Sequence, residues 1–194
     1  DAGFRVFTID QRNHGLSPHS DVWDYESMAN DLHEFIELHQ LDKPILIGHS
    51  MGGKTLMFFE LMYPGISEKI IIVDIAPRAY ESHHEAVMHA LISVKFDEIT
   101  TRKQAEEILN LHISDFGTKQ FLLKNIYWKN PETNLLDWRF NLKTIRKEYD
   151  NIGVEVPLKK SEVETLFIKG GKSHYLTGSD LNDIATRFPN YSMK

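Results

Sequence analysis

The chain has 194 residues, of which 41% are hydrophobic and 26% are charged, and its 28 acidic and 22 basic side chains give a formal charge of −6. This length predicts one domain with room for an insertion, and the composition is typical of a globular protein with a packed core. The acidic balance argues against a nucleic-acid partner, and the absence of cysteine excludes disulfides, thiolate metal sites and a cysteine nucleophile.

The first predicted elements are a strand, a loop and a helix. Residues 4–10 combine β-branched and aromatic side chains and end in a polar cluster, which predicts a buried parallel strand. The loop 11–18 then lies at the carboxyl end of that strand, the edge where open α/β sheets bind ligands. Residues 25–39 carry apolar side chains at helical spacing, so we expect a helix that packs on one face of the sheet.

Residues 43–54 read KPILIGHSMGGK, an apolar run that leads through a G-x-S-x-G motif into a helix-forming segment. This is the strand, sharp turn and helix context of a nucleophile elbow. We expect Ser50 at the tip of the turn with a positive φ, flanked by Gly48 and Gly52 because side chains there would collide. The N–H of Met51 would form one half of an oxyanion hole. A bare motif of this kind also occurs in ordinary turns, which leaves a structural role for the serine open.

A second apolar strand is predicted over residues 69–73, and the chain then changes character. Strand, helix, strand, helix and strand in this order predict a parallel sheet with right-handed crossovers. From residue 78 to residue 148 the pattern favours helices without intervening strands, over residues 85–94, 101–112 and 119–128. An insertion of this kind predicts a helical cap over the carboxyl ends of the strands. Its aromatic side chains are expected mainly in packing, with a minority facing an acyl pocket.

The sheet pattern returns near the end of the chain. Residues 163–169 predict a strand, residues 181–188 a short helix, and residues 191–193 the start of another strand. The predicted fold class is α/β, with a mostly parallel sheet flanked by helices and a helical cap insertion. The predicted domain organisation assigns residues 1–77 and 157–194 to the core and residues 78–156 to the cap.

A nucleophilic serine needs a base, usually histidine, and an acid that orients the base. The order serine, acid, histidine favours Asp74 as the acid, because it ends the strand that follows the elbow helix, 74 − 50 = 24 residues after Ser50. The alternative position is the loop at residues 170–173, which has no carboxylate before Asp180. A purely structural role for Asp74, as a cap or a loop-tying acceptor, is the other interpretation.

The chain has ten histidines, and none stands out as the base. His49 lies inside the elbow and is expected to border the site with its side chain directed away from the serine. His174 keeps the order serine, acid, histidine and is the weaker alternative for the base. The adjacent pair His83 and His84 lacks the i, i+4 spacing of zinc helices, so we expect no metal and no cofactor.

Six segments spread in order along the chain carry a resemblance to a known family: DQRNHGLSP at 10–18, GHSMGGK at 48–54, VDIAP at 73–77, QFLLK at 120–124, WRFN at 138–141 and FIKGG at 167–171. On these segments the chain resembles the α/β-hydrolase superfamily, and within it the YbfF-like and ABHD11-like esterases. The resemblance implies a serine esterase that acts on small-molecule carboxylic esters or acyl thioesters beneath a helical cap. It also implies Ser50 as nucleophile and Asp74 as acid.

Two motifs of this family do not occur in the chain. One is a His-Gly-x-x-Gly-Ser-like loop, which supplies the second oxyanion N–H, and the other is a Gly-His-Trp-like segment with the catalytic histidine. We therefore expect a central piece of a hydrolase of roughly 250 residues, with the fold incomplete at both ends and the catalytic histidine outside this chain. Other hydrolase reactions (C–C or lactone hydrolysis), a pyruvate-eliminating synthase and a truncated, non-catalytic scaffold remain alternatives.

The sequence also bears on location and partners. No apolar run approaches the roughly 18 residues of a membrane span, and no signal peptide is visible. We therefore expect a cytoplasmic protein without a membrane partner. The sequence does not set the oligomeric state.

Overall fold

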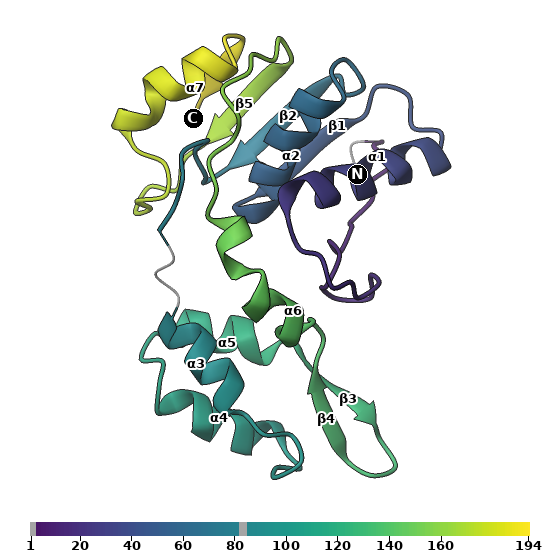
Figure 1. Ribbon diagram of the computed structural model, residues 1–194, viewed down its shortest axis with the longest axis vertical. Helices are drawn as coiled ribbons and strands as arrows, with labels where there is room; N and C mark the ends of the chain where they lie inside the picture. The colour runs from purple at the N-terminus through teal and green to yellow at the C-terminus, as the bar shows by residue number, and fades with distance from the viewer. Residues whose placement is uncertain (1–2, 82–84) are drawn as a thin grey trace. The chain divides into compact units, whose positions relative to one another are not determined.

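The computed structural model describes residues 3–81 and 85–194. The chain divides into two compact units, one formed by Asp1–Asp21 and Ser82–Tyr149 and the other by Val22–Glu81 and Asp150–Lys194 (Figure 1). We call the first the helical unit and the second the sheet unit. The predicted division into core and cap, and the placement of the cap over the strand ends, stay predictions.

The sheet unit contains a four-stranded sheet with the strand order β1-β2-β5-β6. All three neighbouring pairs are parallel, so the predicted parallel sheet is confirmed. The strands are β1 (Ile45–His49), β2 (Lys69–Val73), β5 (Glu164–Ile168) and β6 (Tyr191–Met193). The helical elements are α1 (Tyr25–Leu38), α2 (Met51–Met62), α7 (Leu181–Arg187) and the 3-10 helix η2 (Gly178–Asp180), with a second 3-10 helix, η1 (Tyr149–Ile152), at the boundary of the unit.

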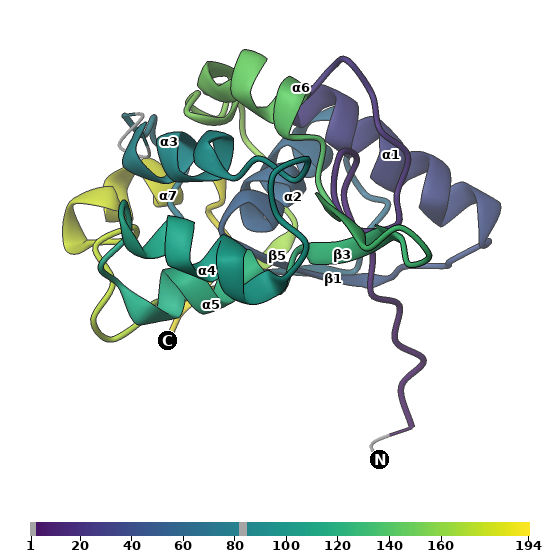
Figure 2. The same ribbon diagram turned by 90° about the horizontal axis from the view of Figure 1, so that it is seen from below.

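One face of this sheet is covered and forms the core of the unit. Ile70 and Ile72 of β2 and Phe167 of β5 are fully buried there, because alternate side chains of a strand point to the same face. Helices α1 and α2 lie together on this face (Figure 2). The opposite face leaves Ile45 and Ile47 of β1 exposed, at 45% and 68%.

The two helices on the covered face form for different reasons. Helix α1 begins at the N-cap Asp24, whose carboxylate accepts a hydrogen bond of 2.7 Å from the backbone N–H of Ser27. It buries an apolar stripe that includes Met28 and Ile36. Helix α2 is buried on all sides from Gly53 to Leu61, which is the pattern of a central core helix.

The described residues of the helical unit form four helices and a hairpin. These elements are α3 (Glu85–Ser93), α4 (Arg102–Asn110), α5 (Phe116–Leu123), β3 (Ile126–Asn130), β4 (Leu135–Trp138) and α6 (Leu142–Lys147). The helices predicted over residues 85–94 and 101–112 are confirmed. Helix α4 begins with a capping box, in which Thr101 accepts from the N–H of Gln104 while the Gln104 side chain accepts from the N–H of Thr101.

The expectation of helices without intervening strands is wrong for the hairpin region. The helix predicted over residues 119–128 ends at Leu123, and β3 pairs with β4 in antiparallel register. The physical reason is local: Tyr127 and Trp128 favour a strand, and the turn that follows places Asn134 at a φ of 53°. Burial of Ile126 and Trp138 on one side of the hairpin completes the pairing.

The strand predicted over residues 4–10 is also wrong. The segment forms no strand, and Phe4, Val6 and Ile9 are exposed at 74%, 76% and 47%. A parallel strand needs a hydrogen-bonded neighbour, and no strand among the described residues pairs with this segment. Composition alone does not make a strand without such a neighbour.

The loop that follows is held inside the helical unit by two asparagines. Asn13 is fully buried with a φ of 66°, and its backbone oxygen accepts from the N–H of Asn141 at 2.8 Å. The Asn141 side-chain amide also donates to the Asn13 side-chain oxygen at 3.1 Å. These bonds support a structural role for the loop 11–18.

Candidate active site

The turn between β1 and α2 has the backbone that the sequence predicts. Ser50 lies between the two elements with a φ of 50° and a ψ of −117°, so the predicted positive φ is confirmed. A residue other than glycine adopts such a φ only when the surrounding structure forces it. Here the N–H of Ser50 donates to the oxygen of Val73 at 2.9 Å, and the oxygen of Ser50 accepts from the N–H of Lys54 at 3.0 Å. The sheet and the helix therefore fix this residue from both sides.

The glycines of the motif allow the strand and the helix to pass at close range. A Cβ at Gly48 would lie 2.4 Å from the oxygen of Gly52, which no ordinary packing permits. The crowding predicted at Gly48 is confirmed, that at Gly52 stays a prediction, and crowding is also found at a residue that the sequence analysis did not single out. A Cβ at Gly53 would lie 2.9 Å from both the oxygen of Gly48 and a methyl carbon of Ile75. The signal was present in the sequence as a second glycine directly after the motif.

The Ser50 hydroxyl does not cap its own helix. Serine at an N-cap normally accepts a hydrogen bond from an N–H in the first turn, and Asp24 and Thr101 do so for α1 and α4. Ser50 makes no such bond, because its backbone is left-handed rather than extended. The half-buried hydroxyl and the first N–H groups of α2, beginning at Met51, therefore stay available.

Asp74 occupies the equivalent position on the neighbouring strand. His49 and Val73 are paired in register at the ends of β1 and β2, so Ser50 and Asp74 are the next residues on two parallel strands about 4.8 Å apart. Asp74 also has a left-handed φ, of 57°. Its N–H donates to the oxygen of Ile168 at 2.8 Å, and its carboxylate accepts from the N–H of Gly170 at 3.0 Å. The structure thus brings the predicted nucleophile and acid to one edge of the sheet.

The chain matches the family described as alpha/beta hydrolase fold over residues 1–193. The chain belongs to the α/β-hydrolase fold family. This α/β hydrolase is 34% identical to Esterase YbfF of Escherichia coli (strain K12) over 185 residues, which are 95% of this chain and 70% of that protein. It is 36% identical to the sn-1-specific diacylglycerol lipase ABHD11 of Danio rerio over 194 residues, which are 96% of this chain and 60% of that protein.

A solved structure gives the same result for the fold. A marine microorganism esterase superposes with a TM-score of 0.89 at 40% identity, over 95% of this chain and 73% of that one. The resemblance to YbfF-like and ABHD11-like esterases and the predicted fold class are therefore confirmed. The α/β hydrolase spans between 60% and 70% of the length of these curated relatives.

No histidine side chain of the described residues is hydrogen-bonded to either candidate catalytic residue. His49 is exposed on the same face of β1 as Ile45 and Ile47, and His174 is exposed with its backbone oxygen 3.5 Å from an Arg78 nitrogen. Within residues 3–81 and 85–194, no histidine side chain hydrogen-bonds the Ser50 hydroxyl or the Asp74 carboxylate. His83 and His84 lie outside the described residues.

Two residues that support Asp74 were missed by the sequence analysis. Gly170 donates its N–H to the carboxylate, and a Cβ on it would lie 3.2 Å from both carboxylate oxygens. Tyr80 braces the loop after Asp74, because its hydroxyl accepts from the N–H of Ala76 at 2.8 Å and donates to the oxygen of Tyr175. Burial raises the pKa of Tyr80, so its hydroxyl stays protonated at neutral pH. No sequence motif contains Asp74 together with Gly170 or Tyr80, so the sequence held no signal for these two contacts.

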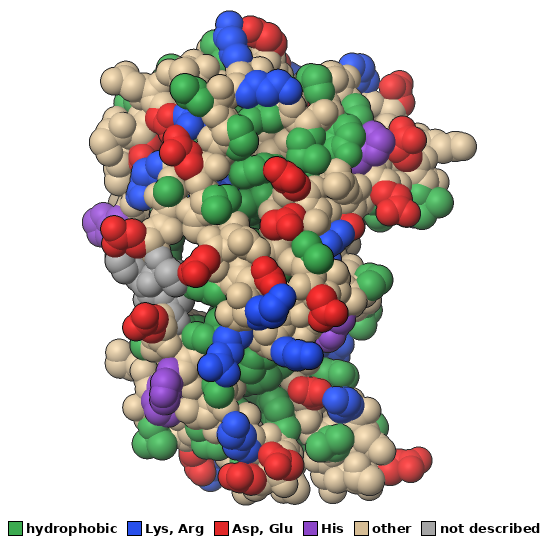
Figure 3. Space-filling view, in the orientation of Figure 1, with side chains coloured by type: hydrophobic (Ala, Val, Ile, Leu, Met, Phe, Trp, Pro, Cys, Tyr) green, Lys and Arg blue, Asp and Glu red, His purple; other side chains and the backbone are tan. Residues whose placement is uncertain are grey.

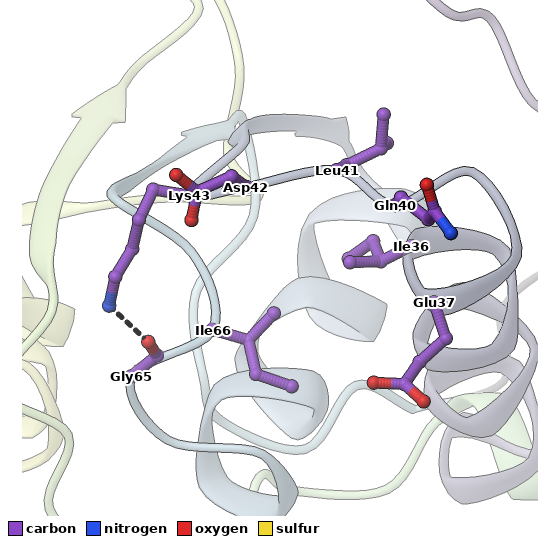
Figure 4. A pocket seen from close by; sticks show the side chains of 8 residues that line it. All are labelled: Ile36, Glu37, Gln40, Leu41, Asp42, Lys43, Gly65 and Ile66. Atoms are coloured by element: carbon purple, nitrogen blue, oxygen red, sulfur yellow. Dashed lines mark hydrogen bonds between the residues drawn. The ribbon is translucent and has the colours of Figure 1, made fainter.

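A separate groove lies at the opposite edge of the sheet. It has a volume of about 440 Å³ and is lined by the turns that precede β1 and β2, where Lys43 donates to the oxygen of Gly65 at 2.5 Å (Figure 4). Because the groove lies at the amino ends of these strands, it is distinct from the edge that carries Ser50 and Asp74. The candidate active site therefore does not include this groove.

Other classes of site receive no support from the described part of the chain. No cluster of three or more histidine, cysteine or carboxylate side chains there could hold a metal ion. No described helix combines the length and the apolar character that crossing a bilayer requires. On the face drawn in Figure 3, basic and acidic side chains are interspersed rather than gathered by sign. The exclusion of nucleic acid as a partner stays a prediction.

Proposed function

We propose that this α/β hydrolase is a serine hydrolase that cleaves carboxylic esters or acyl thioesters through an acyl-enzyme. The backbone of Ser50 carries the proposal: a left-handed serine at a close-packed strand-to-helix turn, with its hydroxyl unused by the helix that follows. Strain of this kind persists where the surrounding structure enforces it, and it is concentrated at functional sites.

In the proposed reaction, the Ser50 hydroxyl oxygen attacks the carbonyl carbon of the substrate while its proton passes to a histidine. The negative oxygen of the tetrahedral intermediate accepts a hydrogen bond from the N–H of Met51, where the free amides and the dipole of α2 favour negative charge. The histidine returns the proton to the leaving alcohol or thiol as the bond to carbon breaks. Water then attacks the acyl-enzyme by the same route and releases the acid.

Asp74 orients the histidine in this proposal. The carboxylate is held by the N–H of Gly170, and its backbone is locked to β5 through Ile168, so it can hold a ring N–H in one direction. We place the histidine itself outside this chain, because no described histidine side chain hydrogen-bonds the Ser50 hydroxyl or the Asp74 carboxylate. The backbone of Gly52 packs directly against Gly48, which keeps the strand and the helix close at the turn. His49 borders the proposed site from the uncovered face of β1.

The names of the relatives support the substrate class. One is an esterase and another a diacylglycerol lipase, so small-molecule carboxylic esters, including glycerolipid esters, are the proposed substrates. Acyl thioesters remain in the proposal because the same attack on a carbonyl carbon cleaves them. A panel of p-nitrophenyl esters, an acyl thioester, a lactone and a diacylglycerol separates these possibilities by their kcat/KM values.

The decisive test replaces Ser50 by alanine in the full-length protein. We expect Ser50→Ala to lower kcat for p-nitrophenyl butyrate by roughly 10³-fold or more, since the nucleophile is gone. Asp74→Asn should lower kcat by roughly 10³-fold while the melting temperature stays within a few degrees, because the left-handed backbone tolerates asparagine.

The control is Ser192→Ala, which removes an exposed serine hydroxyl from β6 of the same sheet. This variant should keep the activity of the unmodified protein. Turnover by Ser50→Ala within tenfold of the control would refute the nucleophile.

A further inference from the structure

Lys54 is a charged residue inside an otherwise apolar helix. It lies in the first turn of α2, and its side chain is fully buried in the stretch from Gly53 to Leu61 that is buried on all sides. Burial of an ammonium group is unfavourable, and the positive end of the helix dipole adds to the cost at this position. An apolar side chain of the same length would avoid both costs. The charge must therefore be offset by specific partners.

Those partners are two backbone carbonyls and two aromatic rings. The Lys54 ammonium donates to the oxygen of Arg78 at 2.9 Å and to the oxygen of Val154 at 2.5 Å. It also lies 4.7 Å from the ring centre of Tyr80 and 5.7 Å from that of Tyr25. Charge-assisted bonds and cation–π contacts of this kind strengthen when water is excluded.

The positions of the bonded residues link the two candidate catalytic residues. Lys54 is 54 − 50 = 4 residues after Ser50, one turn into the helix that begins at the elbow. Arg78 is 78 − 74 = 4 residues after Asp74, in the loop that leaves β2. The Lys54–Arg78 bond therefore joins the element that carries Ser50 to the loop that carries Asp74.

The second bonded carbonyl belongs to the segment that is already tied to that loop. The N–H of Tyr80 donates to the oxygen of Gly153 at 2.8 Å, and the N–H of Val156 donates to the oxygen of Pro77 at 2.8 Å. Lys54 thus holds one carbonyl on each of two cross-linked segments. These are the segments through which the chain leaves the sheet unit after Glu81 and returns to it at Asp150.

We propose that Lys54 is a positioning residue that fixes the Asp74 loop against the first turn of α2 and so sets the separation of Asp74 from Ser50. The proposal rests on the function proposed above for these two residues. Lys54 acts through the loop, since its ammonium is bonded to backbone carbonyls of that loop and of the segment tied to it. Its removal should loosen the loop and misplace the acid without removing any reacting group.

The charge of Lys54 provides a second way to probe the same contact. Burial lowers the pKa of Lys54 to about 8, the nearby charge of Arg78 lowers it as well, and the carboxylate of Glu155 raises it. The other groups facing the ammonium are the rings of Tyr25 and Tyr80. Below pH 8 the bonds are charge-assisted, and above it a neutral amine forms weaker ones.

The test compares Lys54→Met with Lys159→Met in the full-length protein. Methionine keeps the length of the side chain and removes the donors. Lys159 is the matched control, because its ammonium also donates to a carbonyl of α2, that of Leu61 at 2.6 Å, far along the helix from Ser50. The measurements are kcat and KM for p-nitrophenyl butyrate, and hydrogen exchange at the amides of Ala76, Tyr80 and Gly170.

We expect Lys54→Met to lower kcat by about tenfold or more with KM within about threefold, and to speed exchange at those three amides by about tenfold. Lys159→Met should change neither. Unchanged exchange at the three amides in Lys54→Met, or the same increase there and throughout β1, would overturn the proposal. Hydrogen exchange does not depend on turnover. If Ser50→Ala failed to abolish activity, the proposed serine mechanism would be refuted, but the exchange measurement would still test whether Lys54 holds the loop.

A wild-type measurement covers the case in which Lys54→Met does not fold. Exchange at Tyr80, corrected for its intrinsic pH dependence, should rise between pH 7 and pH 9.5 relative to the amide of Phe188, which donates to Ile184 at 2.7 Å at the end of α7. A constant ratio of the two rates across this range would overturn the proposal.

Discussion

The two ends of helix α2 each bury one charged side chain, but the partners differ. Near the start, the Lys54 ammonium is bonded to two carbonyls and is flanked by two rings. Near the end, Glu60 is also fully buried, but only one of its oxygens accepts a hydrogen bond, from Ser67, while the other has no partner among the described residues. The charged form is therefore well supported at the first end and poorly supported at the second.

The protonation of each residue follows from this difference. The pKa of Lys54 is lowered to about 8, so it stays mainly charged at neutral pH. Burial raises the pKa of Glu60 to about 7, with the Ser67 hydrogen bond and the charge of Lys43 acting against the shift, so it is close to half protonated there. The end that carries the candidate active site is thus fixed near neutral pH, whereas the other end responds to pH.

The largest expected effect comes from filling the close approach at the first end. Gly48→Ala introduces a Cβ that would lie within 2.6 Å of three backbone atoms, including the oxygen of Gly52, so the strand or helix must shift. We expect a loss of about 3 kcal/mol or more in the free energy of unfolding, measured by urea denaturation, and a complete loss of the proposed esterase activity.

The matched control is Gly171→Ala, where a Cβ meets nothing within 4 Å and φ is not left-handed. This variant should stay within about 0.5 kcal/mol of the unmodified protein. Equal stability of the two variants would show that the elbow tolerates a wider spacing of its strand and helix.

A smaller effect is expected at the second end, and it depends on pH. Because the pKa of Glu60 is higher in the folded state than its ordinary value of 4.5, folding favours the protonated form. The stabilising contribution is complete below about pH 4.5 and is lost as the pH rises through 7. Glu60→Gln removes this loss. We therefore expect the difference in free energy of unfolding between the variant and the unmodified protein to shift in favour of the variant by about 1–3 kcal/mol between pH 5 and pH 8.

Urea denaturation at the two pH values measures the Glu60 effect, and Glu68→Gln provides the control. Glu68 is an exposed carboxylate next to Ser67 in the same turn. Its replacement should leave the pH dependence of stability unchanged. A Glu60→Gln variant that loses stability at pH 8 would show that the carboxylate is charged and well solvated in the folded protein.

The smallest expected effect comes from Ser67→Ala. The variant removes the donor to Glu60, which matters most when the carboxylate is charged. We expect a loss of about 1 kcal/mol at pH 8 and less at pH 5, by the same denaturation measurement. A loss that is larger at pH 5 than at pH 8 would contradict the assigned direction of the hydrogen bond.

The sequence was sufficient for elements whose signals are local. The strand–turn–helix at Ser50, strand β2 and helix α1 are set by apolar periodicity, glycines and an N-cap within a few residues of each other. The positions of Ser50 and Asp74 follow from the same elements, since parallel strands in register place both at one edge.

Long-range bonds account for what the sequence did not predict. Lys54 is bonded to residues 24 and 100 positions away, and Asp74 to one that is 96 positions away, so no motif contains either pair. The segment 4–10 has the composition of a strand but no hydrogen-bonded neighbour among the described residues. The helix predicted over residues 119–128 overlaps β3, where Tyr127 and Trp128 favour a strand and the antiparallel pairing with β4 completes it.

The asparagine pair of the helical unit has a consequence for how the protein can be divided. Because Asn13 is bonded to Asn141 across 128 positions, the unit needs its first 21 residues as well as residues 82–149. The polypeptide therefore passes between the units three times, at residues 21, 81 and 149. Excising residues 82–149 as one contiguous fragment would leave the Asn141 amide without its buried acceptor on Asn13. An isolated helical unit would therefore have to be produced from a circularly permuted gene or by combining two fragments.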